Sequence, residues 1–114
     1  MTCQKTIFCD IDGTILQFEE YLPNVVKKSL TSCKEIPGSA EKCSEWHSSG
    51  NIIILVTGRP ESIREITEFQ LQKAGIIYDK LIMGCGCGPR FIINDNDCSA
   101  IKIPRNKGIS SLTL

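Results

Sequence analysis

The most informative stretch of the 114-residue chain is residues 7–14, which read Ile-Phe-Cys-Asp-Ile-Asp-Gly-Thr. An apolar strand here ends in two carboxylates, Asp10 and Asp12. Because successive strand residues face opposite ways, the two acids meet only if the backbone turns after Ile11, and Gly13 gives the freedom for such a turn. Converging carboxylates repel each other unless a cation lies between them. Such oxygen ligands suit Mg²⁺, which also takes phosphate oxygens. The stretch therefore predicts phosphoryl chemistry through a carboxylate nucleophile.

Two later stretches have the same sequence pattern, an apolar run followed by polar residues. Residues 52–59 read Ile-Ile-Ile-Leu-Val-Thr-Gly-Arg, and residues 91–97 read Phe-Ile-Ile-Asn-Asp-Asn-Asp. One such stretch alone is often only a strand and a turn. In open α/β sheets, however, ligands bind at the carboxyl ends of the strands. Three strand ends with polar groups in one chain therefore favour a functional site.

In this order and placement, the three stretches resemble motifs one, two and four of the haloacid dehalogenase superfamily of phosphatases, and they span residues 6–97. The resemblance implies an α/β fold, a three-layer Rossmann-like and mostly parallel sheet of five short strands, in a single domain over residues 1–114. Shorter stretches are similar to small phosphatase-like proteins encoded with bacterial capsule and polysaccharide biosynthesis genes. These stretches are residues 81–84, 93–95 and 105–108.

The apolar pattern predicts the following elements: strands over residues 6–9, 52–56, 81–83, 91–94 and 101–103, and helices over residues 39–48 and 60–74. Strands that alternate with helices and read as continuous apolar runs predict a sheet covered on both faces. Ser39 is the predicted N-cap of its helix. The helix over 60–74 has an apolar stripe in which either Phe69 or Gln70 faces inward.

The chain has no room for a cap domain. Residues 15–37 are long enough for a small flap only, and residues 84–90 form a short connection. In the superfamily, cap domains are inserted at these two places, so the resemblance implies a minimal, capless member. We expect its site to be open to solvent or shielded by a neighbouring subunit of a homo-oligomer.

The resemblance assigns roles to the residues of the first two motifs. Asp10 is the expected nucleophile, which forms an aspartyl-phosphate. Asp12 is the expected general acid and base, and its main-chain carbonyl is an expected metal ligand. Thr57 is expected to bind a phosphoryl oxygen, together with the Gly58 amide at a helix start. Arg59 is expected to reach phosphate or substrate, unless it is a solvated surface arginine.

The fourth motif supplies the expected second carboxylate on Mg²⁺, Asp95. Asn94 and Asp97 are expected to orient the ligands and waters around the ion. Because sequence does not fix where the strand ends, Asp97 is an alternative to Asp95 as the ligand.

The lysine of the superfamily's third motif is absent where related minimal members carry it, since residues 84–88 read Gly-Cys-Gly-Cys-Gly. Lys80 and Arg90 lie at the wrong ends of their predicted strands. Arg105, after the last predicted strand, is therefore the expected substitute for this positive charge. The fallback candidates are Lys102 and Lys107.

The composition of the chain limits the partners and the cellular compartment that we expect for it. The formal net charge is zero, which argues against a dedicated nucleic-acid or membrane surface. The longest apolar run, residues 52–56, is too short to cross a membrane, and we expect no signal peptide. Seven cysteines, without a Cys-x-x-Cys pair, indicate buried thiols in a reducing, cytoplasmic compartment. Cys85 and Cys87 are the exception, with a soft-metal or redox role as the alternative.

The sequence thus predicts a Mg²⁺-dependent phosphomonoesterase that acts on a small phosphorylated metabolite, for example a sugar phosphate. One alternative is a phosphatase for a macromolecular phosphate, such as a nucleic-acid end or a phosphoprotein. The other is a phospholigand-binding protein without catalysis. The lone histidine, His47, is interpreted as a surface or helix-capping residue.

Overall fold

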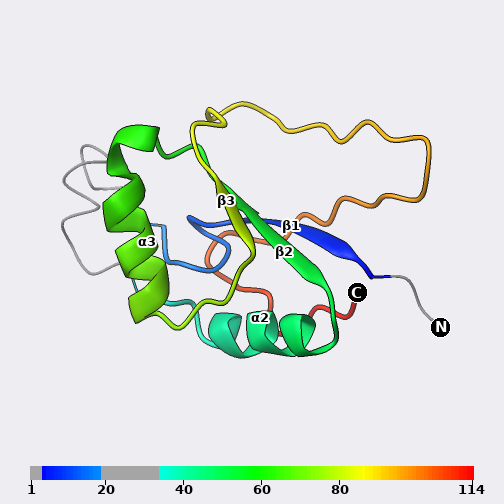
Figure 1. Ribbon diagram of the computed structural model, residues 1–114, viewed down its shortest axis with the longest axis horizontal. Helices are drawn as coiled ribbons and strands as arrows, with labels where there is room; N and C mark the ends of the chain where they lie inside the picture. The colour runs from blue at the N-terminus through cyan, green and yellow to red at the C-terminus, as the bar shows by residue number, and fades with distance from the viewer. Residues whose placement is uncertain (1–3, 19–33) are drawn as a thin grey trace.

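A computed structural model describes residues 4–18 and 34–114, and Figure 1 shows their arrangement. The elements in chain order are β1 (Thr6–Asp10), α2 (Ser39–Ser48), β2 (Ile52–Val56), the 3₁₀ turn η1 (Glu61–Ile63), α3 (Arg64–Lys73) and β3 (Lys80–Ile82). The protein is therefore an α/β fold in which the described residues form a small parallel sheet of three strands and two α-helices. This architecture is compatible with a Rossmann-like fold.

The sheet has the order β1-β2-β3, and both neighbouring pairs are parallel. In the register of the sheet, Asp10 pairs with Val56, and Val56 pairs with Ile82. The three strands therefore end side by side. Whatever follows each strand meets the others at one edge of the sheet.

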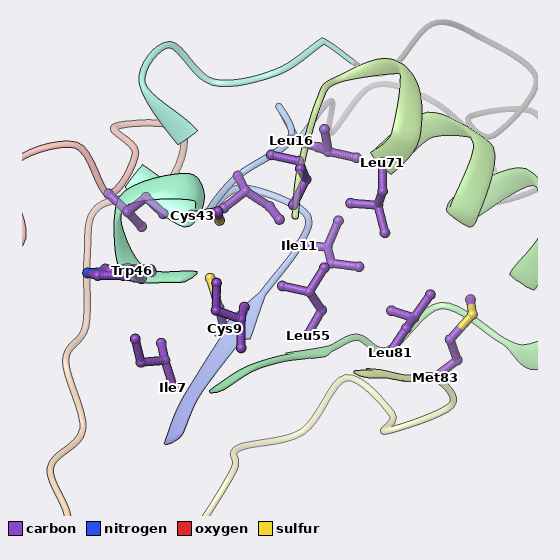
Figure 2. Close-up of a cluster of buried hydrophobic side chains, with 14 of the residues drawn as sticks. Ile7, Cys9, Ile11, Leu16, Cys43, Trp46, Leu55, Leu71, Leu81 and Met83 are labelled. Carbon is purple, nitrogen blue, oxygen red and sulfur yellow. The ribbon is translucent and has the colours of Figure 1, made fainter. Parts of the chain in front are cut away.

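The core lies on the face of the sheet where alternate strand residues are buried. Ile7, Cys9, Ile53, Leu55 and Leu81 are all less than 10% exposed. Figure 2 shows several of these side chains packed with residues of the two helices, among them Cys43, Trp46 and Leu71. Full burial of one such side chain stabilises the fold by about 1.5–3 kcal/mol.

The opposite face of the sheet is partly open, so the prediction of a sheet covered on both faces is wrong. Phe8 is 52% exposed and Ile82 is 44% exposed, whereas their strand neighbours are buried. Because β1, β2 and β3 follow one another in a single direction, right-handed crossovers place α2 and α3 on the same face.

The predicted strands over residues 91–94 and 101–103 do not form, so the sheet has three strands and not five. Residues 84–102 are exposed throughout, and they extend away from the sheet as the yellow and orange segment of Figure 1. Apolar, β-branched composition favours a strand only where a neighbouring strand provides hydrogen bonds and packing. No described segment provides these for residues 91–94.

The other predicted elements are confirmed with small changes. The helix over 39–48 and the strand over 52–56 have the predicted bounds, and β1 and β3 differ from the predicted bounds by one residue. The predicted helix over 60–74 begins later, because Pro60 keeps an extended backbone with ψ 153° and a 3₁₀ turn follows it. Gln70, not Phe69, is the buried member of the pair left open by the pattern.

Ser39 does not cap α2, in contrast to the prediction. The N-cap position is Gly38, with φ 88°, and the Ser39 hydroxyl is buried without a hydrogen-bond partner. Instead, a Glu35 carboxylate oxygen accepts a hydrogen bond from the Ala40 amide at 2.6 Å. A carboxylate at this end of a helix also interacts favourably with the helix dipole.

Most of the predicted flap, residues 19–33, lies outside the described residues. The two ends of the flap that are described lie side by side, since the Gln17 amide donates to the Lys34 carbonyl at 2.9 Å and the Ile36 amide to the Ile15 carbonyl at 2.8 Å. Among the described helices, none has the length and apolar character needed to span a bilayer.

The burial of two cysteines leads to a testable prediction. Burial raises the pKa of Cys9 to about 12 and that of Cys43 to about 11, whereas Cys85, Cys87 and Cys98 are exposed. Because the thiolate is the reactive form, we expect iodoacetamide at pH 8 to modify the three exposed thiols much faster than the two buried ones. Peptide mass spectrometry would measure the rates, with urea-unfolded protein as the control. Fast modification of Cys9 in the folded protein would contradict the packing described above.

Candidate functional site

The backbone turns sharply after β1, as the sequence predicts. The carbonyl of Ile11 accepts hydrogen bonds from three following amides, those of Thr14, Ile15 and Leu16, at 3.0–3.1 Å. Gly13, in the middle of this turn, has φ +86°, a value that residues with a side chain rarely adopt. The turn brings Asp12 near enough to Asp10 for the two carboxylates to repel each other.

Asp10 lies at the carboxyl end of β1 and is half-buried. The pKa of its carboxyl group is raised, mainly because burial disfavours the charged form. Repulsion from Asp12 raises the pKa further, whereas a backbone hydrogen bond from Ile11, the charge of Arg90 and a hydrogen bond from Thr14 lower it. The Thr14 hydroxyl donates to Asp10 Oδ2 at 3.4 Å. Asp10 is thus a carboxylate held in an unfavourable environment, as is common at functional sites.

This environment predicts that Asp10→Asn stabilises the protein at neutral pH. Folding raises the pKa of this carboxyl group above its ordinary value of 3.8. Between these two pKa values the unfolded state loses its proton first, so the folded state becomes less stable as the pH rises through this range. Asparagine carries no charge, so we expect a gain of about 0.5–2 kcal/mol at pH 7 in EDTA. The gain should shrink as the pH falls towards 3.8. Thermal unfolding would show a melting temperature about 2–8 °C higher at pH 7. Equal stabilities at every pH would contradict the cost of burying the Asp10 carboxylate.

Thr57 and Gly58 follow β2 at the same edge of the sheet, beside the end of β1. Thr57 is 1% exposed, and its hydroxyl accepts a hydrogen bond from the Arg59 amide at 3.1 Å. The Thr57 carbonyl accepts a hydrogen bond from the Cys85 amide of the loop after β3. Gly58 is exposed and lies against the backbone of Gly86 in that loop. The ends of β2 and β3 are thus joined through their loops.

Gly58 leaves no space for a side chain, so Gly58→Ala is expected to destabilise the protein. A Cβ atom at this position would lie 2.6 Å from the Gly86 carbonyl oxygen and 3.2 Å from its carbon, both of them backbone atoms. One of the two loops must therefore move, at an expected cost of about 1–3 kcal/mol in urea unfolding. Gly88→Ala is the matched control, because a Cβ there meets nothing within 4 Å. Equal effects of the two substitutions would exclude the close approach of the two loops.

The Arg59 side chain is buried and does not point to solvent. It is 4% exposed, and its guanidinium forms a two-pronged ion pair with Asp12. Nε donates to Asp12 Oδ2 at 2.9 Å, and Nη2 donates to Oδ1 at 2.8 Å. On the other side, Nη1 donates to Thr67 and Gln70 of α3. The arginine therefore connects the turn after β1 with α3, and it is not the solvated surface arginine that the sequence left as the alternative.

Arg90 is a charge at the site that the sequence does not predict. Its attraction lowers the pKa of Asp10, and its Nη2 donates to the Gly86 carbonyl at 3.3 Å. The predicted strand over 91–94 would have placed Arg90 at its start, at the end of the sheet opposite to Asp10. Because that strand does not form, the start of the segment after β3 instead lies against the loop after β2, where the Cys85 amide donates to the Thr57 carbonyl.

Arg105, the predicted substitute for the absent lysine, lies beside the turn after β1. Its guanidinium carbon is 4.4 Å from the centre of the Phe18 ring, and its side chain packs against Gly13. The next residue, Asn106, fixes this loop, because its amide donates to the Gly13 carbonyl at 2.8 Å and its side chain bonds the Phe18 backbone. The loop that carries Arg105 therefore lies against the turn after β1, while the predicted role of Arg105 stays a prediction.

The predicted metal ligands are brought together only in part. Asp10 and Asp12 belong to one turn, but Asp95, Asn94 and Asp97 belong to the exposed segment. In Figure 1 the far end of this segment lies on the side where β1 begins, away from the strand ends. Within residues 4–18 and 34–114, no group of three or more histidine, cysteine, aspartate or glutamate side chains is arranged to hold a metal ion. The predicted Mg²⁺ site, which includes the Asp12 main-chain carbonyl, stays a prediction.

Comparisons with known proteins support the fold alone. No protein-family model matches the chain, and no curated protein matches it significantly. A crystal structure of a structural-genomics target from Vibrio cholerae, for which no function is stated, superposes with a TM-score of 0.62. The match has 22% sequence identity and covers 97% of this chain and 91% of that one. At this identity the likeness concerns the architecture of the chain and not its chemistry.

Proposed function

We propose that this protein is a phosphomonoester hydrolase of the haloacid dehalogenase type, which acts through an aspartyl-phosphate on a small phosphorylated metabolite such as a sugar phosphate. The main support is the position of Asp10. It ends β1 directly beside the end of β2, where Thr57 and Gly58 follow. A carboxylate at the meeting point of two parallel strand ends is well placed to attack a phosphorus atom bound at that edge.

The electrostatics of the site agree with this role. The pKa of Asp10 is raised by burial, yet Arg90 and Thr14 both favour its ionised form. An ionised and poorly solvated carboxylate is a reactive nucleophile, and a nearby guanidinium would also attract a phosphate dianion. In this proposal the chain is a capless core of the superfamily, open to solvent or shielded by a second copy.

Mg²⁺ remains part of the proposal, as the cation that would balance the negative charges of Asp10 and of the phosphate. Asp10 and the Asp12 carbonyl are the two ligands that the turn after β1 could provide. Asp95 would join them only if residues 91–97 took a different path from the described one. A magnesium titration of activity tests this point directly.

A screen of phosphate esters with and without Mg²⁺ tests the proposed function. Suitable substrates are p-nitrophenyl phosphate, sugar phosphates, nucleotides and phosphopeptides, each tested in Mg²⁺ and in EDTA. We expect phosphate release from a small ester by the wild-type protein and none by Asp10→Asn purified in the same way. Equal release by the two proteins would indicate a contaminating phosphatase and would reject the proposal.

One observation favours a second candidate, a phospholigand-binding protein without turnover. The described residues do not assemble three metal-ligating side chains, and the lysine of the third motif is absent. Under this alternative, calorimetry would detect binding of inorganic phosphate or sugar phosphates, and the screen would detect no hydrolysis.

A further inference from the structure

We infer that Arg59 is a positioning residue, which holds the Asp12 carboxylate in place for proton transfer. This inference rests on the proposed function. Both oxygens of Asp12 accept hydrogen bonds from one guanidinium, at 2.8 and 2.9 Å, and the two side chains are only 3% and 18% exposed. Two parallel bonds fix the orientation of a carboxylate as well as its distance, which a single bond does not.

The guanidinium is itself held by a second element. Nη1 donates to Thr67 Oγ1 at 3.1 Å and to Gln70 Oε1 at 2.7 Å. Both residues lie on α3 and are buried, although their positions face the apolar core. Burying a polar side chain is unfavourable unless it is hydrogen-bonded. The placement of Thr67 and Gln70 is therefore explained by their bonds to Arg59, which transmit the position of α3 to Asp12.

The main chain of Arg59 is held as well. Its amide donates to the Thr57 hydroxyl at 3.1 Å, and its carbonyl accepts from the Gly84 amide at 2.7 Å. The residue is thus fixed at both ends, by the loops after β2 and β3 at its backbone and by α3 at its guanidinium. A planar group with this support suits arginine and not lysine, which offers a single, freely rotating ammonium.

Asp12 takes part in a proton transfer in each of the two steps of the proposed reaction. In the first step an Asp10 oxygen bonds to phosphorus, the bond from phosphorus to the leaving oxygen breaks, and the Asp12 carboxyl gives its proton to that oxygen. In the second step a water oxygen bonds to phosphorus, the Asp12 carboxylate takes a proton from the water, and the bond to Asp10 breaks. Small displacements of a catalytic group can cost large factors in rate, so the orientation of Asp12 affects both steps.

A double-mutant cycle tests this inference, because a residue that acts only through Asp12 has no effect once Asp12 is lost. Asp12→Asn is expected to lower kcat by about 10²–10⁴-fold. Arg59→Met is expected to lower it by about 10–100-fold in the wild-type background. In the Asp12→Asn background we expect Arg59→Met to lower kcat further by less than about 2-fold. KM should change little throughout, since the Arg59 guanidinium donates to Asp12 and to two residues of α3.

Three further variants make the test specific. Arg59→Lys should recover little activity, whereas Thr67→Val should give a smaller loss of the same kind and serves if Arg59→Met fails to fold. Arg64→Met is the matched control, since this α3 arginine forms ion pairs with the exposed Glu61 at 2.8 Å and Glu68 at 3.7 Å and donates to the Leu81 carbonyl, away from Asp12. It should leave kcat unchanged.

The outcomes separate the inference from the proposed function. If Arg59→Met costs the same factor with and without Asp12, or mainly raises KM, Arg59 acts on the substrate and the inference is wrong. If the wild-type protein hydrolyses no ester, the proposed function fails and the catalytic part of the inference fails with it. The same cycle measured by urea unfolding then still reports whether Arg59 and Asp12 are coupled, independently of turnover.

Discussion

Asp10→Asn is expected to abolish turnover of the phosphate ester identified by the screen, whereas Asp12→Asn should lower kcat by about 10²–10⁴-fold. The difference follows from their proposed roles. Asp10 supplies the oxygen that attacks phosphorus, and an amide is a poor nucleophile. Asp12 contributes proton transfer only, so some reaction continues without it. Initial rates of phosphate release, measured in excess Mg²⁺, would give both values.

Two further results would complete this comparison. Glu45→Gln removes an exposed carboxylate of α2 and is the matched control, for which we expect the wild-type rate. Wild-type protein quenched in acid during turnover should carry phosphate on the peptide that contains Asp10. Near-normal activity of Asp10→Asn on a substrate that the wild type also hydrolyses would exclude an aspartyl-phosphate mechanism.

The sheet could be predicted where the signal is local. Residues 52–56 are five consecutive β-branched or aliphatic residues, a composition typical of buried strands, and β2 has these bounds. The turn after β1 could also be predicted, because Gly13 and the two acids around Ile11 permit few other conformations. In both cases the residues that carry the signal lie next to one another in the sequence, although β2 itself pairs with strands far along the chain.

The strand over 91–94 could not be predicted correctly from composition. Phe91 and Ile93 are 85% and 96% exposed, although their sequence is as apolar as that of the core strands. Whether such a run joins a sheet depends on the path of the chain before and after it, and on a free strand edge within reach. Neither is encoded in the run itself.

In the candidate site, too, some features have a local sequence signal and others depend on distant contacts. Asp10 and Asp12 lie at the end of one apolar run, and Thr57 and Gly58 at the end of another, so sequence alone predicts their place. The partner of Arg59 depends on a contact across 47 residues. A signal for it was nevertheless present, since Thr67 and Gln70 are polar residues on the inner face of an amphipathic helix, and such residues require a buried partner.

Arg90→Met is expected to lower kcat by about 10²–10³-fold, the usual cost of losing one group that stabilises charge in the transition state. Arg90 is the described cation whose attraction lowers the pKa of Asp10. Without it the pKa of Asp10 should rise further, so activity should begin to fall at a higher pH when the solution is acidified. A pH–rate profile of the wild type and of Arg90→Met would measure both effects.

The comparison that decides the source of this charge includes Arg105→Met and Lys80→Met. Arg105 lies over the Phe18 ring beside the turn, and the sequence predicts it for this role. Lys80 begins β3, two strands away from β1 and in register with Ile54 in the middle of β2, and should have no effect. Arg105→Met could instead cause a large loss of kcat without moving the acidic side of the pH–rate profile, while Arg90→Met causes none. This result would show that Arg105, and not Arg90, supplies the positive charge near the phosphate. Losses for both arginines would mean that the two loops supply the phosphate with charge from opposite sides, because Arg90 follows β3 and Arg105 packs on the turn after β1.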